Sequence, residues 1–239
     1  MPTYGLHLAL ADLEQIAVIE ENLAAYNAYL RGLQELSRYS SEGADQALVE
    51  FRRAVELDPE FALAWAALAD SYAMICMYWD ASRANLDGAD SASRKALSLA
   101  PDLADAHVSR GLSFTVRREH AAAAAEFDTA LKLNPDLFEA SYFYGRICFQ
   151  QGKLERAAAL FEQAERARPE DFQAPILLRQ VYSSLGRDKD ALAAAQRGVI
   201  RAEKHLQLNP DDTRALNLGL GGFVTLGNKE RAIEWAERS

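Results

Sequence analysis

The residue types that most often carry chemistry are few and scattered in this sequence. The histidines are His7, His107, His120 and His205, and the cysteines are Cys76 and Cys148. A zinc site needs several such ligands at short turn or helix spacings, and none of these residues has suitable neighbours. Two isolated cysteines favour free thiols in a reducing compartment, which predicts a cytoplasmic location. We therefore predict no metal ion and no cofactor.

One glycine-rich stretch, GLGGF at Gly219–Phe223, could suggest a nucleotide-binding loop. Such loops follow a strand and carry a further glycine at fixed spacing, and neither condition is met here. Close helix packing explains these glycines better. Asp211 and Asp212 form a carboxylate pair just after a proline, where they favour the dipole of a following helix. No nucleophile pattern accompanies them, so we predict no catalytic residues and no enzymatic activity.

Composition and charge exclude other classes of protein. The chain has 239 residues, 49% hydrophobic and 26% charged, with a formal net charge of −9. Such a chain is expected to fold, and it offers no basic patch for nucleic acid or an anionic membrane surface. No apolar run approaches the roughly 20 residues that span a bilayer.

Five prolines divide the chain at similar intervals. They are Pro59, Pro101, Pro135, Pro169 and Pro210, and the intervals between them are 42, 34, 34 and 41 residues. A residue before proline avoids the α region, so each proline marks the end of one helical segment. Each interval can hold two helices, A and B in chain order. The sequence therefore predicts an all-α fold built from helix pairs.

The residues between the prolines recur as well. Gly111 and Phe127 in one unit correspond to Gly145 and Phe161 in the next. Glycine and alanine let two helices cross closely, and the aromatic rings fill the remaining space. An earlier unit keeps the spacing W-x2-L-x3-Y, with the residues Trp65, Leu68, Ala69 and Tyr72.

The two longer intervals predict departures from the regular unit. Eight extra residues before Pro101 predict a lengthened helix A and a loop that closes at Asp87-Gly88. Seven extra residues before Pro210 are close to two helical turns. Helix B of that unit is therefore expected to continue to about Leu208 without rotating its apolar face.

The predicted organisation is an N-terminal helix over residues 1–24 and a repeat array over residues 25–239. The units span about 25–61, 62–103, 104–137, 138–171, 172–212 and 213–239. About five and a half helix pairs of this kind stack into a right-handed α-solenoid, with the N-terminal helix as an addition. That helix carries an apolar stripe of Leu6, Leu10, Leu13, Ile16 and Ala17. Ile233 and Trp235 leave the last helix without a polar cap, so either end could mediate self-association.

By these residues the chain resembles the tetratricopeptide-repeat superfamily, whose signature is W-x2-L-G-x2-Y…A-x3-F…P. The segment ALVEFRRAVELDPEFALAWAALADSYAM resembles more narrowly the repeat regions that follow bacterial class III adenylate or guanylate cyclase domains and occur in some winged-helix regulators. In those proteins a TolB-like segment often precedes the repeats, and Leu6–Asn22 is similar to the end of such a segment. The resemblance implies a scaffold within a larger bacterial signalling protein.

A binding groove is expected along the A helices, which line the inner surface of a curved repeat array. Carboxylates in this groove would repel an acidic peptide, so a basic or apolar protein segment is the expected partner. Some of the aromatic rings could instead cover the core of a neighbouring unit. The candidate groove residues are Tyr26, Tyr29, Asp70, Asp105, Val108, Glu139, Tyr142, Arg146, Phe149 and Ile176.

The sequence thus favours a non-catalytic scaffold that binds a protein segment, as a regulatory or assembly module. A module for homo-oligomerisation of the parent protein is the main alternative. A small-molecule sensor is a third, less favoured because no chemically active residues cluster.

Overall fold

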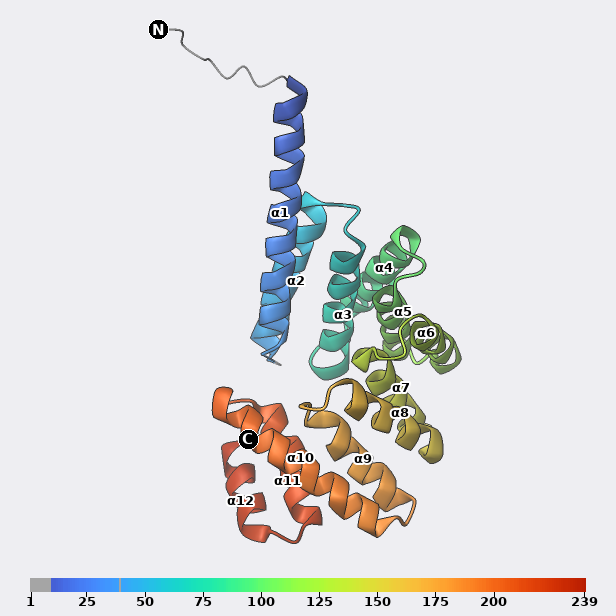
Figure 1. Cartoon of the computed structure of the whole chain (residues 1–239), viewed down its shortest axis with the longest axis vertical. Helices are drawn as coiled ribbons and strands as arrows, with labels where there is room; N and C mark the ends of the chain where they lie inside the picture. The colour runs from blue at the N-terminus through green and yellow to red at the C-terminus, as the bar shows by residue number, and fades with distance from the viewer. Residues whose placement is uncertain (1–9, 39) are drawn as a thin grey trace. The chain divides into compact units, whose positions relative to one another are not determined.

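The computed structural model describes residues 10–38 and 40–239, which contain twelve α-helices and no strand (Figure 1). They form two compact units that divide between Ala100 and Pro101. The first unit holds α1 (Leu10–Leu36), α2 (Ser41–Leu57), α3 (Ala62–Tyr78) and α4 (Arg83–Leu99). The second holds α5 (Ala104–Val116), α6 (His120–Leu133), α7 (Phe138–Gln150), α8 (Leu154–Ala167), α9 (Gln173–Ser184), α10 (Asp188–Leu208), α11 (Thr213–Thr225) and α12 (Lys229–Arg238).

Consecutive helices pack as antiparallel pairs within each unit. The most extensive contacts join α1 with α2 and α3 with α4, and then each A helix of the second unit with the B helix that follows it. Each B helix also contacts the next A helix of its own unit. This order confirms the predicted all-α, helix-pair architecture.

The five prolines mark the ends of the B helices, as the sequence predicts. All five B helices that precede a proline end two residues before it, and the residue between is the C-cap. These five C-caps share φ between −133° and −141° with ψ between 69° and 95°. Proline excludes the α region for its predecessor, so one local rule terminates every one of these helices.

The turns from helix A to helix B in the second unit each contain a residue with positive φ. Gly152, Gly186 and Gly227 supply it in three successive pairs, with φ of 72°, 70° and 73°. Glycine adopts this conformation at no steric cost. In the pair α5–α6 the same place is taken by Arg118, with φ of 63°, where an L side chain is strained.

Aromatic rings of the B helices pack onto glycines of the preceding A helices. There are three such rings, those of Phe51, Phe127 and Phe161, and all of them are fully buried. A Cβ atom added to any of the three glycines would lie 3.0 Å or less from the facing ring, so each glycine makes room for a ring. The pairs are Gly32 with Phe51, Gly111 with Phe127, and Gly145 with Phe161.

The predicted loop at Asp87-Gly88 is wrong. Both residues lie inside α4, and the connection from α3 is the short segment 79–82. Ser82 is the N-cap of α4, and its side-chain oxygen accepts from the Asn85 amide, which starts the helix earlier than expected. A Cβ atom on Gly88 would lie only 2.7 Å from the Tyr72 ring. Gly88 therefore serves close helix packing, and the extra residues lengthen both α3 and α4 to 17 residues.

The predicted extension of helix B in the fifth pair is confirmed. Helix α10 has 21 residues and ends at Leu208, compared with 14 residues in α6 and in α8. Ala195, Val199, Ala202 and Leu206 are buried along it, so the added turns keep the same apolar face. On its other side Arg197 donates two hydrogen bonds to Glu165, at 2.7 and 2.9 Å.

Helix α1 runs without a break from Leu10 to Leu36. Residues 10–24 therefore continue directly into helix A of the first pair. The predicted apolar stripe of Leu6, Leu10, Leu13, Ile16 and Ala17 lies outside the residues whose side chains are described. The same holds for most of the TolB-like segment at Leu6–Asn22.

Candidate functional site

In the second unit the A helices approach one another more closely than the B helices do. Helix α5 contacts α7, and α9 contacts α11, whereas no pair of B helices in this unit makes comparable contact. The A helices are therefore on the inner side of this unit, as the repeat pattern predicts. We define the A-helix face as the surface that carries Asp105, Glu139, Phe143, Arg146, Phe149 and Arg179.

One end of the A-helix face is acidic. Asp105 on α5 and Glu139 on α7 are both partly exposed. Burial and the nearby Glu139 raise the pKa of the Asp105 carboxyl. Glu139 accepts from Arg168 at 2.7 Å, and that guanidinium also lies 4.1 Å from the centre of the Phe138 ring. The Arg168 guanidinium thus partly compensates the negative charge of Glu139. Asp105 forms none of the ion pairs found among the described residues.

The middle of the face combines a cation with aromatic rings. The Arg146 guanidinium lies 5.8 Å from the centres of both the Tyr142 and the Phe143 rings. Phe143 and Phe149 are partly exposed. A guanidinium held over ring faces and partly exposed aromatic side chains suits contact with apolar or aromatic groups of a peptide.

Beside this face, a buried polar network joins three A helices. Tyr142 donates to the Gln173 side-chain oxygen at 3.2 Å and accepts from Arg214 at 2.9 Å. Arg214 also donates to Gln173 at 2.8 Å, and Gln173 donates to Asp171 at 3.2 Å. Burial raises the pKa of the Asp171 carboxyl, although backbone amides of residues 173 and 174 donate to it. The network fixes α7, α9 and α11 relative to one another.

Three predicted groove residues are not accessible. Val108, Tyr142 and Ile176 are 2%, 3% and 0% exposed. Ile176 belongs to the buried core that contains Phe172 and Val199, and the Tyr142 hydroxyl belongs to the buried network. Expecting their side chains in an open groove is therefore wrong, because the helix position alone does not reveal what packs over it.

Asp105, Glu139, Arg146 and Phe149 remain partly exposed in the second unit. Tyr26, Tyr29 and Asp70 belong to the first unit, where Tyr26 is 49% exposed. The rings of Tyr26 and Tyr29 lie 6.2 Å apart, and each packs near Phe61, at 6.4 and 5.2 Å. These two tyrosines thus form an aromatic cluster at α1.

Two arginines of the inner side, Arg179 and Arg214, are absent from the residues predicted for the groove. Arg179 donates to the Thr225 hydroxyl at 2.8 Å, and burial lowers the pKa of its guanidinium. A Cβ atom on Gly221 would lie 3.1 Å from this guanidinium. Gly221 therefore leaves space for the charged group. In the sequence, this glycine inside a predicted helix was the only indication that a large side chain packs against it.

Replacing Tyr142 by phenylalanine is expected to lower the free energy of unfolding by about 1–3 kcal/mol. The change leaves an arginine donor without its acceptor in a buried network. Tyr26→Phe is the matched control, because the Tyr26 ring is half exposed, and it should change stability little. Urea unfolding followed by circular dichroism measures both. Equal effects of the two changes would contradict a structural role for Tyr142.

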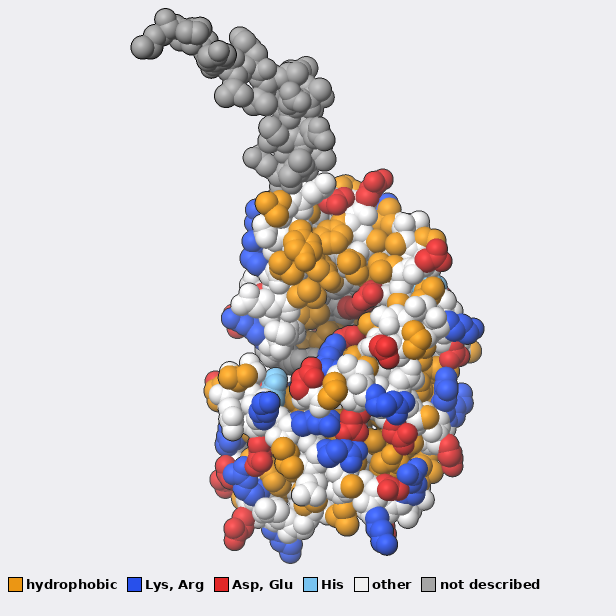
Figure 2. All heavy atoms as spheres, viewed as in Figure 1, with side chains coloured by type: hydrophobic (Ala, Val, Ile, Leu, Met, Phe, Trp, Pro, Cys, Tyr) orange, Lys and Arg blue, Asp and Glu red, His pale blue; other side chains and the backbone are white. Residues whose placement is uncertain are grey.

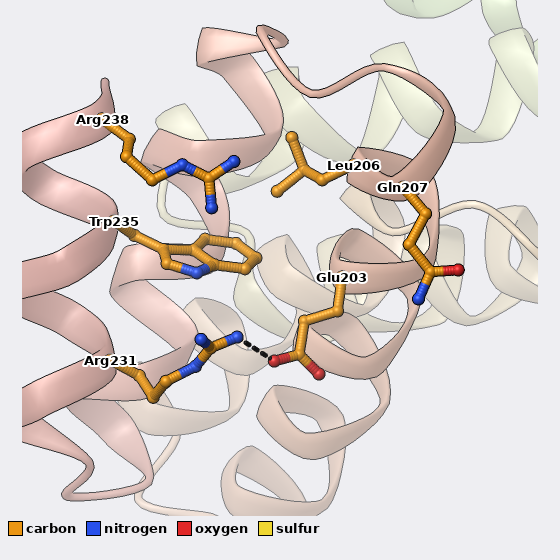
Figure 3. Close-up of a pocket in the computed structure, with 6 residues that line it drawn as sticks. All are labelled: Glu203, Leu206, Gln207, Arg231, Trp235 and Arg238. Atoms are coloured by element: carbon orange, nitrogen blue, oxygen red, sulfur yellow. Dashed lines mark hydrogen bonds and ion pairs between the residues drawn. The ribbon is translucent and has the colours of Figure 1, made fainter.

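A separate hollow of about 430 Å³ lies between α10 and α12. Figure 3 shows the Trp235 ring between the side chains of Arg238 and Arg231, with Glu203 facing Arg231. Arg231 pairs with both Glu203 and Glu234, and Arg238 pairs more loosely with Glu234. The charged side chains that line the hollow are thus already paired within the unit. The lengthened α10 creates this hollow, since Leu206 near its end forms one wall.

His107 and His205 have packing roles in the structure. His107 takes the place that Trp65 has in the preceding pair, and both rings bond the carbonyl of a proline six residues earlier, at 2.8 and 2.9 Å. His205 lies 2.7 Å from an Asp212 carboxylate oxygen. Within residues 10–38 and 40–239, no three His, Cys, Asp or Glu side chains gather in a way that could hold a metal ion. No helix of this part of the chain is long and apolar enough to cross a membrane.

Comparison with known proteins identifies the class of repeat. Two family models described as tetratricopeptide repeat match residues 108–172 and 149–209. No curated protein sequence matches the chain significantly. These matches confirm tetratricopeptide repeats in the second unit.

Three solved structures illustrate the similarity in fold. PilW, described as a widely conserved type IV pilus biogenesis factor, has a TM-score of 0.60 and 25% identity, over 88% of this chain and 90% of its own. Pseudomonas aeruginosa pilF has a TM-score of 0.61 and 21% identity, over 90% of each chain. TTC0263, a thermophilic TPR protein of Thermus thermophilus, has a TM-score of 0.61 and 21% identity, over 81% of this chain and 99% of its own.

The chain therefore has the all-α fold of tetratricopeptide solenoids. That fold suggests a scaffold for protein–protein interaction, because repeats of this type bind peptides and proteins on their surfaces. The comparisons do not show the narrower resemblance to cyclase-associated repeat regions, which stays a sequence-based prediction.

Proposed function

We propose that this chain is a non-catalytic scaffold that holds a basic or apolar segment of another protein on the A-helix face of its second unit. The observation that carries the proposal is the occurrence on one face of Asp105, which has no cationic partner among the described residues, and of Arg146, a guanidinium over aromatic rings. A cationic side chain would offset the negative charge of Asp105, which the nearby Glu139 disfavours. Apolar side chains of the same segment would lie over Phe143 and Phe149.

The wider setting that we propose is a regulatory or assembly module of a larger bacterial signalling protein in the cytoplasm. The resemblance of the first two repeats to cyclase-associated regions supports the signalling setting. The similarity to PilW, a biogenesis factor, supports a role in assembly. Cys76 and Cys148 are unpaired, which fits a reducing compartment.

The charge preference can be tested with labelled leucine-rich peptides that differ only in carrying Lys, Gln or Glu at one central position. Fluorescence anisotropy should rank their affinities in that order. Asp105→Asn should reduce the preference for Lys over Gln by about fivefold, or about 1 kcal/mol, as for a partly exposed ion pair. Asp188→Asn, at an exposed site on a B helix, should leave it unchanged. Equal affinity for the Lys and Glu peptides would refute the proposal.

The same binding should depend on pH in a defined direction. A cation favours the ionised carboxyl, so affinity for the Lys peptide is complete above the pKa of Asp105 in the free protein and falls as pH drops through it. Burial and Glu139 raise that pKa from its ordinary value of 3.8. The loss should therefore begin at a higher pH than for an ordinary aspartate, and it should disappear in Asp105→Asn. Anisotropy titrations at stepped pH measure it.

A further inference from the structure

Helix α1 presents an apolar stripe that the rest of its unit leaves largely exposed. Leu23, Tyr26, Leu30 and Leu33 are 58%, 49%, 43% and 39% exposed. Figure 2 shows hydrophobic side chains gathered on the visible face of this unit, beside α1. Large apolar side chains are common singly at a surface, but a contiguous row of them marks an interaction site.

The spacing of the stripe is that of a coiled-coil seam. The four residues follow one another at intervals of three, four and three, which are successive a and d positions of a heptad. The sequence continues the same spacing backwards to Ile19 and Ile16. We call the row Leu23, Tyr26, Leu30 and Leu33 the α1 seam.

The seam is separate from the face that α1 uses within its own unit. Ala25, Ala28 and Gly32 are buried, and Gly32 meets the Phe51 ring of α2. Because these residues lie on another side of the helix, α1 can hold α2 and a second helix at once. Helix α1 has 27 residues and α2 has 17, so part of α1 extends beyond its partner, as Figure 1 shows. Lone helical extensions of this kind are marginal in water.

The near absence of charge along the α1 seam indicates which partner could bind it. Between residues 22 and 34 the only charged residue is Arg31, and Arg31 pairs with Glu50 at 3.0 Å. The positions that flank the seam hold Asn22, Asn27 and Gln34, which are uncharged and exposed. A strongly basic or acidic partner would find no complementary charge here. A second copy of this chain, whose net charge of −9 opposes association elsewhere, meets no repulsion along this row.

We propose that two copies of this chain associate through their α1 seams, as a two-stranded coiled coil with two-fold symmetry. Symmetry makes the contact self-complementary, since each copy supplies the same a and d residues to the other. Tyr26 then belongs to this interface rather than to a peptide groove. The scaffold would present two A-helix faces per assembly.

Sedimentation velocity of the full chain tests the proposal. The wild type should be a dimer at micromolar concentration, and the double variant L23E/L30E should be a monomer with unchanged helical circular dichroism. The matched control is Ile200→Glu on α10, where the replaced side chain is 56% exposed, and it should remain a dimer. A wild type that stays monomeric up to high micromolar concentration would overturn the proposal, as would a control that dissociates as fully as L23E/L30E.

A charge-exchange experiment identifies the occupant. L23K/L30K should also be monomeric alone, because both copies then carry like charges in the seam. Mixing it with L23E/L30E should restore a dimer that contains one copy of each variant. If the mixture stays monomeric while the wild type dimerises, the seam does not pair with itself and the proposal is wrong. A helix of another protein would then be the occupant to seek.

Discussion

Phe161→Ala is expected to lower the free energy of unfolding by about 3–5 kcal/mol. Phe161 is fully buried, and its ring packs on Gly145, at 3.0 Å from a Cβ built there. The Tyr142 ring meets it edge-on, with centroids 6.1 Å apart. Since the glycine has no side chain that could fill the vacated space, the cavity should persist and the cost should be near the upper end of this range.

The measurement is urea unfolding followed by circular dichroism, with hydrogen exchange to locate the loss. Repeat arrays gain stability from contacts between neighbours, so protection should fall first in α7 and α8. Phe161→Leu keeps most of the volume and should cost less than about 1.5 kcal/mol. Leu192→Ala, at a side chain 46% exposed, is a surface control with little expected effect. A loss under about 1 kcal/mol for Phe161→Ala would contradict the proposed packing.

Trp235→Ala is expected to cost a similar amount, about 3–5 kcal/mol. Trp235 is 1% exposed and meets the Phe223 ring edge-on, with centroids 4.9 Å apart and an interplanar angle of 84°. It anchors the last helix pair, since its ring occupies the place where a Gly219 side chain would be. A Cβ atom there would lie 2.1 Å from the indole. Loss of the ring should therefore release α12.

A double-mutant cycle makes this prediction specific. In a helix interior Gly→Ala is ordinarily favourable by up to about 1 kcal/mol. Gly219→Ala should nevertheless be destabilising by about 1–3 kcal/mol, because the new methyl group collides with the indole. In the Trp235→Ala background the collision is gone, so Gly219→Ala should become stabilising. An unchanged sign in both backgrounds would show that the indole does not depend on Gly219.

Some site residues could be predicted from position in the repeat, and others could not. The rule that places certain positions of helix A inward names Asp105, Glu139 and Arg146, which are partly exposed on their A helices. Their part in binding stays a prediction. The rule failed for Tyr142, because Arg214 reaches it from 72 residues further along the chain. The rule also failed for Ile176, which it placed in the groove, because that side chain is fully buried and lies 2.4 Å from a Cβ built on Gly198. Gly198 replaces the usual alanine for that reason.

Of the two structural consequences of the longer proline intervals, one could be predicted from the sequence and the other could not. The extension of α10 was predictable, because seven residues are close to two turns and preserve the apolar face. The placing of the α3–α4 connection was not. Asp87-Gly88 is a turn signal by composition, but the Ser82 cap and the packing of Gly88 on Tyr72 put that dipeptide inside a helix.

The sequence by itself determined the helix pairs and their ends in this protein, since proline and turn glycines restrict the backbone locally and small and aromatic residues recur with the repeat. It also determined the heptad spacing in α1. Only the tertiary structure decided which rings are buried and which are offered to a partner. That choice depends on contacts between helices far apart in the chain, such as Arg214 on Tyr142, and no local pattern encodes them.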